Sequence, residues 1–302
     1  MALTSASQPI RNNRPAVSIG LPVFNGAEHL GEAIESLLNQ TYADFELIIS
    51  DNCSTDGTRA ICERFAGEDA RVCYIRQPQN IGAPRNWNVV AHYATGTYFK
   101  WASANDYCNE RFVEECLLEL ERDPKAVLAF GRTCLVDDSR DTMTDYEGDV
   151  EVLDERPSDR FRRVLRSWAL NNAQSGLFRL AVLRKTGLDR PYVGGDLQLM
   201  LELSLHGRFK RVPTAVLYRR VANDSMSTNL TREQLDHLID PLSTSGTRLA
   251  AWPKHWDRLT TIVRSPIAGV EKLACIGTTL REAAWDRSRL VRELPILLKN
   301  AL

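Results

Sequence analysis

Nowhere in its 302 residues does the sequence contain an apolar run approaching the roughly 20 residues that a membrane-spanning helix needs. The first residues also lack the apolar run of a secretory signal, so we expect residues 1–14 to form a flexible tail. Lys and Arg (38) nearly balance Asp and Glu (39), and the net charge of -1 gives no overall field that would attract nucleic acid. These absences predict a cytoplasmic protein without a nucleic-acid partner.

Common signatures of metal and nucleotide binding are also absent. The seven cysteines are odd in number and form no CxxC pair, which argues against a zinc knuckle and against a disulfide framework. No GxGxxG follows the first predicted strand, and neither GxxxxGKS nor GxxxxGKT occurs. Dinucleotide-binding and P-loop proteins are therefore disfavoured.

The first hundred residues instead alternate strand and helix patterns. Short apolar runs rich in β-branched residues predict strands, and apolar residues at three- and four-residue spacing predict helices. The predicted strands are 16–23, 45–50, 71–75 and 98–102, and the predicted helices between them are 30–38, 58–65 and 87–93. Such alternation with short connections predicts a parallel sheet with helices on both faces.

Polar clusters follow three of these strands, at 24–25, 51–56 and 103–106. In open parallel sheets, ligands bind beyond the carboxyl ends of the strands. We therefore expect the three clusters to surround one crevice, with Asn25 also capping the helix that follows it. Asp56 is expected to serve as a structural cap, and Trp101 as a core residue.

The remaining two-thirds of the chain is more helical. Helices are predicted at 110–120, 160–170 and 197–206, strands at 127–130 and 215–218, and an irregular acidic surface loop at 137–160. Residues 231–302 are predicted to be helical, and from Lys254 onward nine Lys or Arg face five Asp or Glu. This basic C-terminal region either packs on the preceding domain or makes peripheral contact with the inner face of a membrane.

Five segments carry a resemblance to a known family. They are VSIGLPVFNG (17–26), SLLNQTYADFELIISDNCSTDGT (36–58), NIGAPRNWN (80–88), YFKWASAND (98–106) and GGDLQLMLELSLHGRF (194–209). In this order and spacing they resemble the family 2 glycosyltransferases of the GT-A fold, over residues 16 to about 220.

The resemblance implies a Rossmann-like, mostly parallel central sheet flanked by helices, with a C-terminal helical extension. The catalytic domain would span 15–222, divided into a nucleotide-sugar-binding half (15–106) and an acceptor half (107–222), followed by a helical region (223–302). The implied activity is inverting transfer of a sugar from a nucleoside diphosphate, UDP or dTDP, to a hydroxyl of a glycan or lipid-linked saccharide.

The resemblance also assigns the nucleotide-sugar site. Asp51 would accept a hydrogen bond from the pyrimidine ring N–H, and Pro22, Phe24 and Asn25 would line the base and ribose pocket. Asn80 and Asn86 either orient that pocket or bond the loop backbone. Arg219 and Arg220 either reach the diphosphate or the acceptor, or are surface arginines at a strand end.

A divalent metal, Mg²⁺ or Mn²⁺, usually offsets the diphosphate charge in this family and is held by an Asp-x-Asp motif. Here Ser103 and Asn105 stand where carboxylates are usual, and Asp106 is the carboxylate that remains. Asn105 and Asp106 are expected to contact the donor, and Asp106 the metal, because hard cations prefer such oxygens. The alternative is that Asp106 caps the next helix.

An inverting transfer also needs a base for the acceptor hydroxyl. The resemblance assigns this role to Asp196, with Gly195 where the family often has Glu, and Asp189 is the reserve candidate. A carboxylate at a helix N-terminus is also a common cap. A non-catalytic nucleotide-sugar-binding or scaffold protein with a degenerate metal site is the alternative function.

Overall fold

The structure, a computed structural model, describes residues 14–167, 169–221, 231–242 and 251–301. Its strands form one mixed sheet in the order β3-β2-β1-β4-β8-β6-β9-β5, and β7 pairs with β6. The strands are β1 (Val17–Val23), β2 (Phe45–Asp51), β3 (Val72–Arg76), β4 (Tyr98–Trp101), β5 (Tyr107–Cys108), β6 (Ala126–Asp137), β7 (Thr142–Tyr146), β8 (Leu177–Arg179) and β9 (Arg208–Arg220). The first four are parallel to one another, and β8 opposes β4.

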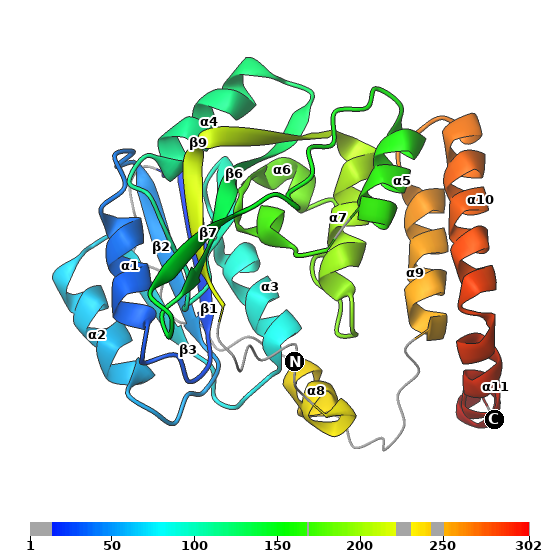
Figure 1. Cartoon of the computed structure of the whole chain (residues 1–302). Helices are drawn as coiled ribbons and strands as arrows, with labels where there is room; N and C mark the ends of the chain where they lie inside the picture. The colour runs from blue at the N-terminus through cyan, green and yellow to red at the C-terminus, as the bar shows by residue number, and fades with distance from the viewer. Residues whose placement is uncertain (1–13, 168, 222–230, 243–250, 302) are drawn as a thin grey trace.

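Helices cover both faces of this sheet (Figure 1). Odd-numbered residues of β1 and β2 pack with α1 (Leu30–Leu38), α2 (Thr58–Glu68) and α4 (Phe112–Arg122) on one face. On the other face, Phe99 and Trp101 pack in a second core, which also includes residues of α3 (Ala83–Tyr93), α5 (Pro157–Ser167), α6 (Leu180–Leu183) and α7 (Gly195–His206). Trp101 is fully buried, which confirms its predicted place in the core. A 3-10 turn, η1, spans Asn172–Ser175.

The C-terminal helices α9 (Ala251–Arg264), α10 (Gly269–Trp285) and α11 (Arg287–Ala301) form an outer layer beyond α5 and α7 (Figure 1). Two ion pairs tie this layer to the rest of the molecule, Arg190–Asp257 at 2.8 Å and Arg156–Glu271 at 3.0 Å. The structure therefore confirms that these helices pack on the preceding domain through one side, and the opposite side of α10 is exposed. No helix in the described ranges has the length and apolarity needed to cross a membrane.

Residues 137–160 differ from the predicted irregular loop. Strand β6 continues to Asp137, the chain turns back as β7, and α5 begins at Pro157. Residues 142–145 are exposed, so β7 has no apolar alternation to indicate a strand, and its backbone pairing with the long β6 defines it. An ion pair between Arg132 and Asp145 bridges the hairpin.

Candidate active site

A cavity of about 150 Å³ opens beyond the carboxyl ends of β1, β2 and β4, where the three polar clusters were expected to meet. Its lining comes from four parts of the chain: Pro22 to Gly26, Asn52, residues of the 80–87 segment, and Ser103 to Asn105. Leu238 of α8 (Arg232–Ile239) completes the wall. Since pockets that enclose a whole ligand are typically about 300–1,000 Å³, this one fits part of a large ligand.

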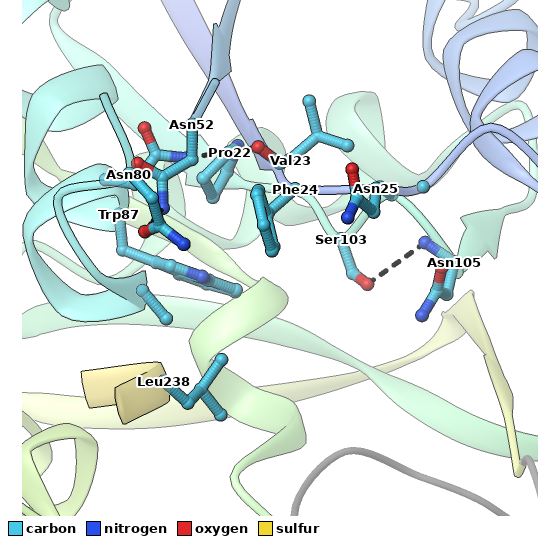
Figure 2. A pocket seen from close by; sticks show the side chains of 14 residues that line it. Pro22, Val23, Phe24, Asn25, Asn52, Asn80, Trp87, Ser103, Asn105 and Leu238 are labelled. Carbon is cyan, nitrogen blue, oxygen red and sulfur yellow. Dashed lines mark hydrogen bonds between the residues drawn. The ribbon is translucent and has the colours of Figure 1, made fainter. Parts of the chain in front are cut away.

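Two asparagine side chains form one end of the pocket, and Figure 2 shows Ser103 and Asn105 at the other. Asn52 donates from Nδ2 to Asn80 Oδ1 at 2.8 Å, and its Oδ1 accepts from the Ile81 N–H at 2.8 Å. Asn80 Oδ1 also accepts from the Gly82 N–H at 2.9 Å. These bonds fix the orientation of both amides before a ligand arrives.

Asp51 does not line the pocket, although the resemblance gave it the base contact. The residue is fully buried, and Oδ1 accepts from the Ser54 N–H at 2.7 Å. Oδ2 accepts from the Tyr74 hydroxyl at 2.9 Å and forms an ion pair with Arg76. Burial and the bond to this carboxylate raise the pKa of Tyr74. Asp51 therefore stabilises the loop after β2 from inside the protein, and the neighbouring Asn52 lines the pocket.

Asn86 lines the pocket, but its side chain is buried and bonded to the end of β2. Its Nδ2 donates to the Ser50 carbonyl at 2.8 Å, and its Oδ1 accepts from the Ser50 hydroxyl at 2.6 Å. These bonds join α3 to the end of β2. The adjacent Trp87 presents its ring to the pocket, and its carbonyl accepts from Trp101 Nε1 at 3.0 Å.

The loop after β1 is held by hydrogen bonds to the loop after β2. Asn25 adopts a positive φ of 51° and accepts from the Thr55 N–H at 2.8 Å. The expected helix cap at Asn25 is wrong, because α1 begins four residues after Gly26, with His29 at the N-cap position. Asp56 accepts from the Thr58 N–H at 3.0 Å and from the Ala27 N–H at 3.1 Å, so its role is structural, although Gly57 occupies the N-cap position of α2.

Asp106 lies where β4, β5 and the end of β9 meet, and Arg219 is the cation that most favours the charged form of its carboxylate. Partial burial raises the pKa of Asp106, and Arg219 and the Arg220 N–H oppose that rise. The Arg220 N–H donates to Asp106 Oδ1 at 3.1 Å. Because α4 starts at Phe112, with Arg111 at its N-cap position, Asp106 is not a helix cap.

The two arginines at the end of β9 differ in the number of protein groups that they bond. Arg220 bonds Asp138, Glu32 and the Asn105 carbonyl, and it stacks over the Tyr107 ring at 5.0 Å. Within the described residues, the Arg219 side chain donates one hydrogen bond, to Asn172 Oδ1. Arg220 thus joins α1, the loop after β4 and the β6–β7 turn, whereas Arg219 has donors left for a ligand.

Hard oxygen ligands for a divalent cation are few at this end of the pocket. The described residues hold no group of three or more His, Cys, Asp or Glu side chains that could bind a metal. Asp106 supplies one carboxylate, and the Ser103 hydroxyl and Asn105 amide supply neutral oxygens nearby in the chain. This donor set fits a cation that is also bound by ligand phosphates.

Asp196 stands in the first turn of α7, and its Oδ2 accepts from Asn171 Nδ2 at 3.0 Å. Gly194, with φ of 85°, occupies the N-cap position, so Asp196 is not the cap. A Cβ on Gly195 would lie 2.1 Å from the Arg190 carbonyl oxygen. The tight turn before α7 therefore requires glycine at the position where the resembled family often has Glu.

Asp189 is adjacent to Asp196 in this turn. Burial, followed by repulsion from Asp196, raises the pKa of Asp189 to about 7. Its N–H donates to Asn88 Oδ1 at 3.0 Å, and Asn88 Nδ2 donates back to the Asp189 carbonyl at 2.8 Å. Since Asn88 follows Trp87, α3 holds both the pocket wall and the carboxylate turn.

Sequence reasoning missed Asn52, Trp87 and Leu238 as pocket residues. Asn52 is the first residue beyond β2, a position that faces the crevice in this type of sheet. Trp87 stands within a segment that carried the family resemblance, so its sequence context was a usable signal. No local pattern marks Leu238, because α8 reaches the pocket through tertiary contact with α3.

Comparison with known proteins matches residues 18–187, more than half of the chain, to the family model described as Glycosyl transferase family 2. The chain is 26% identical over 233 residues to chondroitin synthase of Pasteurella multocida (strain Pm70), covering 74% of this chain and 23% of that protein. The chain thus spans about a quarter of the length of this relative.

Two solved structures show the same fold. TarS of S. aureus (residues 1–349), in complex with UDP, superposes with a TM-score of 0.61 at 16% identity over 90% of this chain and 73% of that one. The same fragment is also known with UDP-GlcNAc. The mannosyltransferase PcManGT from Pyrobaculum calidifontis, with GDP-Man and Mn²⁺, gives a TM-score of 0.52 at 14% identity, covering 95% and 81% of the two chains.

Proposed function

Because the chain belongs to glycosyl transferase family 2, we propose that it is an inverting glycosyltransferase that uses a nucleoside diphosphate sugar. The acceptor is a hydroxyl of a glycan or lipid-linked saccharide, a choice supported by the similarity to chondroitin synthase. A uridine donor is supported by the UDP and UDP-GlcNAc complexes of TarS, and dTDP remains the second candidate. The observation that carries the proposal is the pocket at the carboxyl ends of β1, β2 and β4.

The base and ribose of the donor would occupy this pocket. Pro22 and Phe24 supply the apolar surface, and Asn25 lies beside them. Asn52 and Asn80 present amide groups that can bond the edge of a pyrimidine, since an amide offers both a donor and an acceptor. Asp51 and Asn86 hold these elements in place through the bonds that bury them.

The diphosphate would lie toward Ser103, Asn105 and Asp106. Arg219 is the cation there with donors to spare, and a guanidinium matches phosphate oxygens in a bidentate geometry. A bound Mg²⁺ or Mn²⁺, held by Asp106 with the Asn105 and Ser103 oxygens, would offset the charge of the leaving diphosphate. The Mn²⁺ in the PcManGT complex supports this assignment.

Asp196 is the proposed general base. Its carboxylate accepts the proton of the acceptor hydroxyl as that oxygen attacks the anomeric carbon, on the face opposite the diphosphate. The bond from the anomeric carbon to the diphosphate oxygen breaks, and its electron pair leaves with the nucleoside diphosphate. Asn171 holds the Asp196 carboxylate, so the base keeps one orientation as the acceptor enters.

A non-catalytic nucleotide-sugar-binding protein is the second candidate, and Ser103 and Asn105 are the observation that favours it. Such a protein would bind the donor and release no nucleotide. Release of nucleoside diphosphate in the presence of saccharide acceptors therefore separates the two functions.

A thermal-shift panel of UDP, dTDP, GDP and CDP, each with and without Mn²⁺ or Mg²⁺, tests donor binding. A nucleotide at 100 times its dissociation constant stabilises the folded state by about 2.7 kcal/mol, which such a measurement resolves. We expect UDP or dTDP to stabilise the chain, and the metal to increase the effect. Equal stabilisation with and without the metal would assign binding of the diphosphate to Arg219 alone. The absence of a thermal shift with every nucleotide would contradict donor binding.

A further inference from the structure

The outer face of α10 and α11 carries a stripe of exposed apolar side chains. Val270, Leu273, Leu280 and Val291 are 66%, 71%, 55% and 68% exposed. The spacing of three and seven residues places Val270, Leu273 and Leu280 on one side of α10, which has about 3.6 residues per turn, and Val291 follows in α11. Trp285, the last residue of α10, is 85% exposed. Glu271, Cys275 and Thr279 are buried on the opposite side.

The carboxylates of this helical layer are turned away from that stripe. Each acidic residue between 251 and 294 bonds a group inside the protein: Asp257 with Arg190, Glu271 with Arg156, Glu282 with Arg258, Asp286 with Lys254, and Glu293 with the Ala251 N–H. The outward face therefore carries little negative charge of its own.

Most described basic side chains of this helical layer, unlike its carboxylates, are not paired with charged groups inside the protein. Six have no carboxylate partner within the part of the chain that the structure describes: Arg264, Lys272, Arg281, Arg287, Arg289 and Arg292. Four of them bond only backbone carbonyls of the same layer. By helical spacing within α10, Lys272 lies on one side of the stripe and Arg281 on the other, and Arg287 and Arg292 follow in α11.

A second copy of the chain is a poor occupant for this face. Parallel two-fold pairing of the stripe would place Arg281, Arg287 and Arg292 opposite their own counterparts, with no exposed carboxylate nearby to pair them. Gly277 would leave a gap in the seam, and Arg287 would interrupt it. The exposed apolar and basic side chains of α10 and α11 instead match a partner surface with an apolar interior and anionic groups at its boundary.

We propose that α10 and α11 bind the surface of a bilayer that contains anionic lipids, with the stripe lying in the interfacial plane. Apolar side chains enter the acyl boundary, the flanking cations meet lipid phosphates, and Trp285 lies at the headgroup level. Arginine stems extend along the apolar surface while their charged ends stay in water. In Figure 1 these two helices form one outer edge of the molecule, away from the central sheet.

Vesicle flotation of the full chain tests this directly, and it requires neither donor nor acceptor. We expect binding to vesicles of phosphatidylcholine mixed with phosphatidylglycerol, little binding to phosphatidylcholine alone, and loss of binding as salt rises. Equal binding to both vesicle types, or binding to neither, would overturn the proposal.

Matched variants locate the surface. Arg281→Gln and Arg292→Gln should each weaken binding roughly fivefold, and Leu273→Gln with Leu280→Gln about tenfold or more. Met143→Gln and Arg140→Gln, on the exposed β6–β7 hairpin, should bind as the wild type does. Unchanged binding in the stripe variants would contradict the proposal. So would a dimer in sedimentation velocity that the leucine variants dissolve, since it would assign the stripe to a second copy.

Discussion

Asp51 and Asn52 are adjacent in the chain and have different environments. Asp51 bonds Ser54, Tyr74 and Arg76 inside the protein, whereas Asn52 lines the pocket and bonds Asn80. Removing Asp51 leaves three polar groups without their acceptor, one of them an arginine that is 30% exposed. The first residue should therefore govern stability, and the second should govern ligand binding.

We predict that Asp51→Ala lowers the free energy of unfolding by about 2–4 kcal/mol. Asn52→Ala should lower it by about 1 kcal/mol and weaken nucleotide affinity about tenfold. Urea unfolding and isothermal titration with UDP measure the two effects, and each variant is the control for the other. Unchanged affinity in Asn52→Ala would remove this residue from the site.

The burial of Asp51 on one side of β2 could be predicted from the sequence. Phe45, Leu47 and Ile49 share its parity and form one core face, so alternation along a strand places Asp51 on that same face. The resemblance gave the base contact to Asp51, which stays a prediction, whereas the structure places Asn52 in the lining of the pocket. Periodicity, applied to the strand end, would have pointed to Asn52.

Asp189 makes stability depend on pH. Its pKa of about 7 exceeds the ordinary value of 3.8, so between these values the folded state keeps a proton that the unfolded chain has lost. The contribution of this Asp189 proton to the free energy of unfolding is fully present below pH 4, and it is lost as pH rises through 7.

Asp189→Asn removes this dependence. We predict that the unfolding free energy of the wild type, relative to the variant, falls by roughly 2 kcal/mol between pH 5 and pH 8. Urea unfolding at the two values tests this. A difference that stays constant with pH would mean that Asp189 ionises as an ordinary carboxyl.

Helix α8 closes the pocket through a contact that depends on one glycine. Gly82 has φ of 87°, and a Cβ there would lie 2.3 Å from the Ile239 carbonyl oxygen. Arg85 also pairs with Asp240 at 2.6 Å, which holds the end of α8 against α3. Leu238 therefore reaches the pocket only while this close approach is kept.

Gly82→Ala should displace α8 and weaken UDP binding, and its backbone strain should cost about 1–3 kcal/mol of stability. Gly31→Ala is the matched control, because its Cβ meets nothing within 4 Å in α1. That control should gain about 1 kcal/mol and bind UDP normally. Equal UDP affinity in the two variants would show that α8 is not part of the site.

Elements with strong apolar periodicity were predictable, and elements made by pairing were not. The helix over 30–38 and the strand at 45–50 match α1 and β2 closely, since each has a buried face that its sequence marks. The exposed β7 and the two-residue β5 have no such face and exist through pairing with β6 and β9. The acidic 137–160 segment was therefore predicted as a loop.

At the scale of the whole molecule, the predicted GT-A fold with its C-terminal helices is confirmed. The alternation of strand and helix patterns predicted the parallel strands β1 to β4. The resemblance to the family predicted the remaining architecture. The proposed domain boundaries at 15, 107 and 223 remain predictions. The predicted tail over 1–14 lies outside the described residues except for its last position.

The central claim is that this fold performs sugar transfer with Asp196 as the base. The most direct test is release of nucleoside diphosphate, from the sugar donor of the nucleotide that binds best, in the presence of saccharide acceptors. We predict that Asp196→Asn lowers this rate roughly 10²–10⁴-fold and leaves nucleotide affinity unchanged, whereas Asp141→Asn, at the exposed β6–β7 turn, behaves as the wild type. Wild-type turnover in Asp196→Asn would contradict the account.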